Sequence, residues 1–139
     1  MKLITEKEIE VRFSEVDLMK VVWHGSYPLY FEDAREAFGR EWGLSYEKYM
    51  ELNTFAPIVE LNIKYRKPIL YGSKPVVRIT YVPTSAAKVI FDYEIFDPQD
   101  GTVFATARSV QVFMSSDGQL LWFCPDFYEE WKAKYDFND

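Results

Sequence analysis

The sequence has only one cysteine, Cys124, and only one histidine, His24, among its 139 residues. A single cysteine cannot form a disulfide within the chain, and one cysteine with one histidine falls short of the usual zinc ligand sets. Carboxylates alone do not specify a metal. We therefore predict neither a metal site nor another cofactor.

Long apolar runs and an excess of basic residues are also missing. No run of about 18 apolar residues occurs, and residues 1–13, MKLITEKEIEVRF, lack an apolar run of signal-peptide length. Sixteen Lys and Arg against 22 Asp and Glu give a net charge of -6, which argues against nucleic-acid binding. These absences predict a cytoplasmic protein with no transmembrane segment and no nucleic-acid partner.

Apolar and aromatic residues, by contrast, are abundant. They make up 48% and 18% of the chain, enough to fill a core, and 139 residues is a typical length for one domain. No internal repeat or linker divides the sequence. We therefore predict a single domain over residues 1–139.

One long helix is predicted between Ser26 and Gly43. The serine hydroxyl can cap free N–H groups, Pro28 is tolerated in a first turn, and the glycine is a natural stop. An apolar stripe at helical spacing follows the helix and consists of Tyr27, Phe31, Ala34, Phe38 and Trp42. Two shorter helices and their caps are predicted over 45–53 with Ser45 and over 125–135 with Asp126.

Alternating apolar and polar residues predict a series of strands. They cover 8–13, 59–66, 75–82, 88–96 and 102–115, after which Asp117-Gly118 turns the chain back toward 119–123. Successive strands with short turns imply an antiparallel sheet, against which the long helix buries its stripe. We predict an α+β fold in which this antiparallel sheet wraps around one long central helix. The exposed edge strand of such a sheet favours pairing with a second copy.

The segment around His24 carries the functional signal. Its pattern consists of Asp17, Val21-Val22-Trp23-His24, Ser26-Tyr27, Tyr30-Phe31-Glu32 and Ala34-Arg35. This pattern resembles the signature of hot-dog-fold acyl-CoA thioesterases, in particular the 4-hydroxybenzoyl-CoA thioesterase family and its Tol-Pal-associated bacterial subgroup. The resemblance implies a hot-dog fold over nearly the whole chain and hydrolysis of an acyl-CoA to a carboxylic acid and CoA. It also implies a homodimer or homotetramer with sites between subunits.

Under this resemblance, Asp17 and His24 are the expected catalytic residues. Asp17 acts as a nucleophile or as a general base, and the sequence leaves both roles open, while His24 orients water or the thioester. Backbone N–H groups of Trp23, His24 and Gly25 at the helix start are the expected oxyanion donors. Without the resemblance, the residues themselves favour a structural interpretation, in which Asp17 is a cap or turn residue and His24 is a partly exposed polar residue or one with a satisfied hydrogen bond.

Two positions depart from the family pattern. The glycine expected before Val21 is Lys20, which adopts glycine-like backbone angles only with strain. The aromatic residue with a hydroxyl expected at position 13 is Phe13, which removes a hydrogen-bond partner from the expected site.

A basic cluster at the end of one predicted strand is the expected CoA-binding site. It comprises Lys64, Arg66 and Lys67, and Arg in particular suits phosphate through its planar fork of donors. The alternative interpretation is a solvated strand face. Two other functions also stay open, namely an acyl-carrier-protein thioesterase and a noncatalytic hot-dog module that binds an acyl-CoA.

Overall fold

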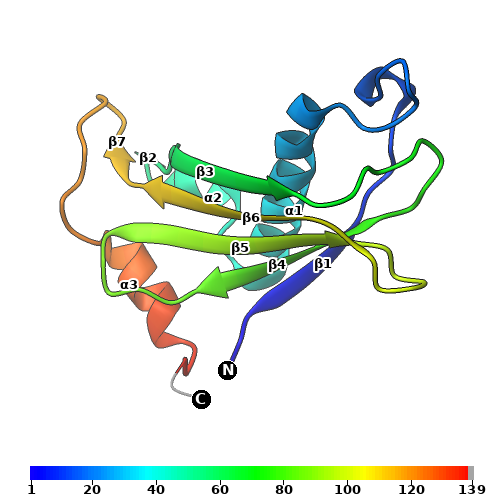
Figure 1. Ribbon diagram of the computed structural model, residues 1–139. Coiled ribbons are helices and arrows are strands. Elements are labelled where there is room, and N and C mark those ends of the chain that lie inside the picture. The colour runs from blue at the N-terminus through cyan, green and yellow to red at the C-terminus, as the bar shows by residue number, and fades with distance from the viewer. Residues whose placement is uncertain (138–139) are drawn as a thin grey trace.

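The structure, a computed structural model, describes residues 1–137, so residues 138 and 139 of the predicted domain lie outside the described part. Its centre is a five-stranded antiparallel sheet with the strand order β1-β4-β5-β6-β3 (Figure 1). The strands are β1 (Ile4–Glu8), β4 (Val76–Val82), β5 (Lys88–Phe96), β6 (Val103–Val112) and β3 (Ile58–Tyr65). A small second sheet pairs β2 (Thr54–Phe55) with β7 (Met114–Ser115). The main sheet therefore has β3 at one edge and β1 at the other.

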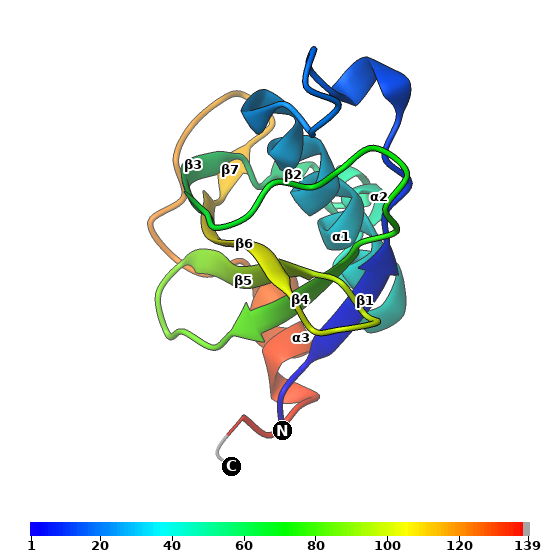
Figure 2. The same ribbon diagram turned by 45° about the vertical axis from the view of Figure 1, so that its right-hand side comes forward.

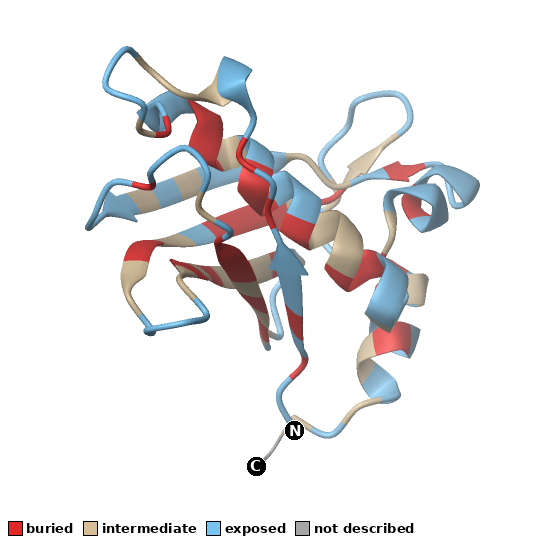
Figure 3. Cartoon of the chain, turned by 90° about the vertical axis from the view of Figure 1, so that its right-hand side faces the viewer, coloured by how far each residue is buried: buried red, intermediate tan, exposed pale blue. Residues whose placement is uncertain are grey.

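The long helix α1 (Tyr27–Trp42) lies along one face of the main sheet (Figures 1 and 2). The predicted stripe forms its buried face, because Tyr27, Phe31, Ala34 and Phe38 are buried and Trp42 is half-buried (Figure 3). The rings of Phe38 and Phe91 have centroids 4.9 Å apart, and those of Phe31 and Tyr93 are 4.8 Å apart. Gly43 ends the helix at a φ of 96°, which confirms the predicted stop.

Two short helices lie outside the sheet. Helix α2 (Tyr46–Glu51) begins after Ser45 as predicted, and the Ser45 hydroxyl accepts the N–H of Lys48 at 3.3 Å. Helix α3 (Asp126–Ala133) packs against the C-terminal end of α1, where the indole N–H of Trp131 donates to the carbonyl of Trp42 at 2.6 Å. This contact ties the C-terminal helix to the end of the central one.

Two of the predicted helix caps are wrong. Pro125 precedes α3 and Asp126 is already its first helical residue, so the Asp126 side chain makes no cap hydrogen bond. The Ser26 hydroxyl does not cap α1, because it donates to the carbonyl of Glu15 at 3.1 Å. This hydroxyl instead ties the start of α1 to the preceding loop.

The first predicted strand is displaced along the chain. The segment 8–13 alternates in burial at its first residues, but the strand itself ends at Glu8. The N–H of Ile9 still donates to Pro75 O at 2.9 Å, after which the chain leaves the sheet edge. Phe13 enters a single 3-10 turn and is 75% exposed. The alternation of apolar and polar residues therefore reflects a buried face of the chain, although the segment after Glu8 does not form a strand.

The predicted strand over 102–115 is interrupted. Strand β6 ends at Val112, and the fully buried Phe113 separates it from β7. The change of direction at Phe113 lets β7 pair with β2. The returning segment 119–123 is not a strand, because only an isolated bridge links Leu120 to Met114.

Candidate active site

Asp17 lies in a tight turn that precedes α1. Its N–H donates to Val21 O at 2.9 Å, and its Oδ1 accepts the N–H of Met19 at 2.9 Å. A bridge between Val16 and Val22 closes the turn. Within residues 1–137, Oδ2 of Asp17 takes part in no hydrogen bond, and the side chain is half-buried. The turn thus fixes one carboxylate oxygen and leaves the other available.

Lys20 adopts the left-handed conformation that the family pattern assigns to glycine. Its φ is 63°, and its N–H donates to Asp17 O at 3.0 Å. The prediction of a strained lysine in this loop is confirmed. The loop therefore keeps a backbone conformation typical of glycine, and Lys20 carries the resulting strain.

Of the predicted oxyanion donors, His24 and Gly25 lie in a 3-10 turn, His24–Ser26, that leads into α1, and Trp23 directly precedes it. The N–H of Trp23 donates to Glu15 O at 2.9 Å and is therefore occupied. The N–H groups of His24 and Gly25 donate to no acceptor within residues 1–137. Two of the three predicted donors therefore stay free at the positive end of the helix.

Glu15, which the sequence motif does not include, holds these segments together. Its carbonyl accepts from Trp23 and Ser26, while its Oε1 accepts the N–H of Arg12 at 2.8 Å and the O–H of Tyr30 at 3.0 Å. Burial, and next the hydrogen bond to Glu15, raise the pKa of Tyr30. No sequence pattern indicates this role of Glu15, because its partners Ser26 and Tyr30 lie 11 and 15 residues away along the chain.

A shallow pocket of about 280 Å³ lies beside this helix start, lined among others by His24, Tyr27, Tyr65, Arg66 and Lys67. The hydroxyl of Tyr65 donates to His24 O at 2.8 Å. The Tyr65 ring meets that of Tyr27 edge-on, with centroids 4.8 Å apart. Burial, and next the proximity of Tyr65, raise the pKa of Tyr27. The pocket therefore joins the end of β3 to the start of α1.

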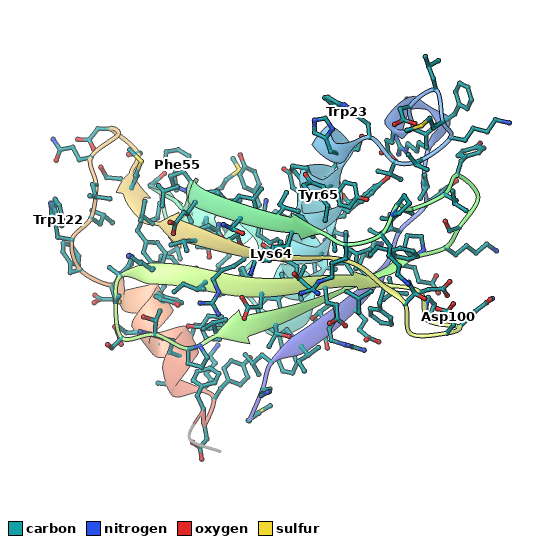
Figure 4. The ribbon with its side chains drawn as sticks, viewed as in Figure 1. Trp23, Phe55, Lys64, Tyr65, Asp100 and Trp122 are labelled. Carbon is teal, nitrogen blue, oxygen red and sulfur yellow. The ribbon has the colours of Figure 1, made fainter. Side chains whose placement is uncertain are left out.

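The predicted basic cluster is divided between two hollows of the surface. Arg66 and Lys67 line the pocket at His24, whereas Lys64 lines a separate charged groove on the sheet face opposite α1. Figure 4 shows Tyr65 close to Trp23 at the start of α1, and Lys64 over the outer face of the sheet. Arg66 lines both hollows, and so marks the rim between them.

Gly25 is covered by the ring of Trp23. A Cβ at Gly25 would lie 2.3 Å from an atom of that ring, so only glycine allows the indole to lie there. The Trp23 ring also sits beside the His24 imidazole, with centroids 5.0 Å apart. Trp23 is 53% exposed, which leaves this indole at the open side of the site.

The described residues 1–137 contain no group of three or more His, Cys, Asp or Glu side chains placed to hold a metal ion. Cys124 lies outside the site, near Lys132 and the carbonyl of Ala86. Burial raises the pKa of its thiol. In the same part of the chain, no helix is both long enough and apolar enough to cross a bilayer.

Comparison with known proteins places this site in a family. The family model described as the Thioesterase-like superfamily matches residues 11–132, and the chain belongs to this superfamily of thioester hydrolases. YneP of Bacillus subtilis, a candidate acyl-CoA thioesterase, is 34% identical over 95 residues, which are 68% of this chain and 69% of that protein. An acyl-acyl carrier protein thioesterase of Arabidopsis thaliana chloroplasts is 29% identical over 111 residues, which are 80% of this chain and 58% of that protein.

Among solved structures, the DHNA-CoA thioesterase of Staphylococcus aureus is similar, with a TM-score of 0.78 and 27% identity. The likeness covers 94% of this chain and 90% of that one. The predicted hot-dog fold, with its antiparallel sheet and long central helix, is confirmed by the family and by this likeness.

Proposed function

We propose that this protein hydrolyses an acyl-CoA to a carboxylic acid and CoA at the pocket beside His24. The observation that carries the proposal is the pair of free N–H groups of His24 and Gly25 at the start of α1. Such donors stabilise the oxygen that becomes negative during acyl transfer, by about 3 kcal/mol for each donor. The names of the bacterial relatives support a CoA thioester as the substrate class.

Asp17 supplies the carboxylate by one of two routes. In the first, Oδ2 of Asp17 attacks the thioester carbon, the C–S bond breaks as CoA thiolate leaves, and water then hydrolyses the mixed anhydride. In the second, the carboxylate takes a proton from a water molecule as that water attacks the same carbon, after which the C–S bond breaks and CoA thiolate leaves with that proton available to it. In both routes the carbonyl oxygen accepts the N–H groups of His24 and Gly25, and the imidazole of His24 orients the water or the thioester.

Arg66 and Lys67 are the proposed partners of the CoA phosphates. Both line the pocket with His24, and the guanidinium fork of Arg66 suits bidentate contact with phosphate. Lys64 lines the groove on the outer face of the sheet and not the pocket at His24, so it is not one of these partners. The 4-hydroxybenzoyl-CoA subgroup, the cytoplasmic location and the single domain over residues 1–139 stay predictions.

The test is release of CoA thiol from a panel of short, long and aromatic acyl-CoAs by the wild type and by Asp17→Asn. The amide keeps an oxygen for the N–H of Met19, so the variant is expected to fold while it loses activity about 100- to 10,000-fold. Asp33→Asn, an exposed carboxylate on α1, is the matched control and is expected to keep wild-type rates. Asp17→Asn with wild-type turnover would assign the chemistry to another residue.

A carrier-protein thioester is the second candidate substrate, because one relative is an acyl-acyl carrier protein thioesterase. The same acyl chain is therefore presented on CoA and on acyl carrier protein, and the two values of kcat/KM are compared. A preference for CoA supports the proposal, whereas a preference for the carrier protein overturns it. Acyl-CoA binding without turnover of either substrate would indicate a noncatalytic module.

A further inference from the structure

Tyr65, the last residue of β3, is bound to the peptide that carries one of the two free N–H donors (Figure 4). Its hydroxyl donates to His24 O at 2.8 Å, and this carbonyl belongs to the same peptide unit as the N–H of Gly25. No peptide bond within residues 1–137 is cis, so the carbonyl and the N–H of this unit point in opposite directions. The direction of the His24 carbonyl therefore fixes the direction of the Gly25 N–H.

Pro28 makes this carbonyl depend on Tyr65. In an α-helix the carbonyl of His24 would accept the N–H of the residue four positions later, but that residue is a proline and has no N–H. The Tyr65 hydroxyl takes the place of the missing donor. The start of α1 thus receives from β3 a hydrogen bond that the helix itself cannot supply.

The turn that contains this peptide can adopt two conformations. The N–H of Ser26 donates to Trp23 O at 2.9 Å, which makes His24 and Gly25 the central residues of a tight turn. Rotation of the central peptide converts a type I turn into a type II turn, which requires a positive φ at the second central residue. Glycine adopts a positive φ freely, so Gly25 permits both conformations.

In the structure the turn has the first of these conformations. Gly25 lies in a 3-10 turn and does not have a positive φ, so its N–H points toward the N-terminal end of α1. Rotation of the peptide would direct the His24 carbonyl there instead, where it would repel the oxygen that becomes negative. The same rotation would take this carbonyl away from the Tyr65 hydroxyl. The hydrogen bond from Tyr65 therefore favours the conformation with the N–H available.

We propose that Tyr65 is a positioning residue of the active site, whose hydroxyl holds the peptide between His24 and Gly25 so that the Gly25 N–H is aimed at the thioester oxygen. The hydroxyl is itself held in place, because the Tyr65 ring meets the buried Tyr27 ring edge-on with centroids 4.8 Å apart. The hydrogen bond also polarises the peptide and strengthens its N–H as a donor. The inference rests on the proposed function, since it needs this N–H to serve as an oxyanion donor.

Tyr65→Phe removes the hydroxyl and keeps the ring that packs on Tyr27. With an acyl-CoA that the wild type hydrolyses, kcat is expected to fall about 5- to 50-fold while KM stays within about twofold. This loss is smaller than the roughly 100- to 1,000-fold that follows complete removal of an oxyanion donor, because the N–H is misdirected and not deleted. An S-alkyl-CoA thioether, which has no carbonyl, is expected to bind the variant as tightly as the wild type. An unchanged kcat, or a loss of thioether binding, would overturn the positioning role.

Tyr71→Phe is the matched control. Tyr71 is 49% exposed like Tyr65, and its ring likewise makes an edge-on contact, in this case with Phe13. Its hydroxyl makes no hydrogen bond within residues 1–137. The variant is therefore expected to keep the kcat and KM of the wild type.

The resonance of one carbonyl reports on the peptide directly. Since His24 is the only histidine, labelling of the histidine carbonyl with ¹³C and of glycine with ¹⁵N selects the peptide between His24 and Gly25 in an NMR spectrum. In Tyr65→Phe this carbonyl resonance is expected to move upfield, the direction that follows loss of a hydrogen bond to a carbonyl, whereas in Tyr71→Phe it stays in place. An unmoved resonance in Tyr65→Phe would show that the hydroxyl does not hold the peptide.

A second substitution is expected to rescue the first. Pro28→Ala supplies an N–H four residues after His24, so the double variant Tyr65→Phe/Pro28→Ala regains a donor for the His24 carbonyl. Its carbonyl resonance is expected to return downfield and its kcat to recover most of the loss. A resonance that returns without recovery of kcat would contradict the link between this peptide and catalysis.

The two readouts separate this inference from the proposed function. A wild-type protein that hydrolyses no thioester would defeat the proposed function and the catalytic role of Tyr65 together. A moved resonance in Tyr65→Phe would in that case still establish that Tyr65 holds the peptide. Active wild type with full kcat in Tyr65→Phe would instead leave the thioesterase standing and reduce the hydrogen bond to a structural contact.

Discussion

At the scale of single residues, Lys20 shows how the turn before α1 is held. Its left-handed backbone has a φ of 63° and places Asp17 and Val21 opposite each other. A residue with a Cβ adopts this conformation at a cost of about 1–2 kcal/mol, whereas glycine adopts it freely. The turn therefore persists because its hydrogen bonds, and the Asp17 carboxylate that accepts two of them, outweigh this cost.

Lys20→Gly is expected to leave the fold intact and to raise the free energy of unfolding by up to about 1 kcal/mol. The relief of strain at φ 63° exceeds the extra entropy that glycine gives the unfolded chain. Urea unfolding at neutral pH measures the difference, and Lys20→Ala, which keeps the strain, is expected to be neutral. A clear loss of stability in Lys20→Gly alone would show that the lysine side chain contributes to the turn.

At the scale of elements, Gly39 marks the place where α1 passes under the loop that follows it. It is buried on the helix, and a Cβ there would lie 2.6 Å from the carbonyl oxygen of Leu44 and 2.7 Å from Cα of Ser45. Both contacts are with backbone, which cannot move aside as a side chain can. The loop at Leu44 and Ser45 can therefore lie this close to α1 only because residue 39 has no Cβ.

Gly39→Ala is expected to destabilise the protein by about 1–3 kcal/mol, although alanine favours a helix by about 1 kcal/mol over glycine. Overpacking against fixed backbone outweighs the gain in helix propensity. Thermal unfolding followed by circular dichroism measures the shift. Ala37→Gly, two residues earlier on α1, measures the effect of the alanine-to-glycine difference in helix propensity by itself. An increase in stability for Gly39→Ala would mean that the loop at Leu44 yields.

Elements with a strong period were predictable from the sequence, and those shaped by distant contacts were not. The stripe from Tyr27 to Trp42 predicted α1, and alternation predicted β5 over 88–96 with the bounds that the structure has. The same period misplaced the first strand, because burial of Ile9 does not require a ladder partner. The break at Phe113 escaped prediction since it depends on pairing with β2, which lies almost 60 residues earlier in the chain.

In the candidate site, too, residues at local spacings were predictable and residues brought in by distant contacts were not. The motif named Asp17, His24 and Gly25 because their spacing is local. It did not include Glu15 or Tyr65, whose hydrogen bonds to Ser26 and His24 depend on how the loop and β3 meet α1. Spacing along the strand grouped Lys64 with Arg66, and both line the groove on the outer face of the sheet, but only Arg66 and Lys67, which follow the end of β3 at Tyr65, also reach the pocket at His24.

At the scale of the whole molecule, buried tyrosines tie stability to alkaline pH. Burial raises the pKa of Tyr81 to about 12, and burial also raises the pKa values of Tyr30 and Tyr93. A raised folded-state pKa means that the unfolded chain releases its proton first, at its usual pKa of about 10. The contribution of these side chains is therefore complete below pH 10 and is lost as the pH rises toward 12.

Urea unfolding between pH 9 and pH 11.5 is expected to show this loss. The free energy of unfolding should fall above pH 10 by up to about 1.4 kcal/mol per pH unit for each such tyrosine. Tyrosinate absorbance recorded on the same samples should rise with unfolding and not before it. Early absorbance from the folded protein, in excess of that from exposed tyrosines such as Tyr46, would show that the buried rings ionise in place.

The position of β3 at the end of the main sheet has a consequence for handling the protein. Within residues 1–137 β3 pairs only with β6, so the backbone groups of Leu61, Ile63 and Tyr65 on its other side have no strand partner. An unpaired edge accepts an extended strand from any source, including a partly unfolded copy of the same chain. We therefore expect slow aggregation of concentrated samples to begin at this edge.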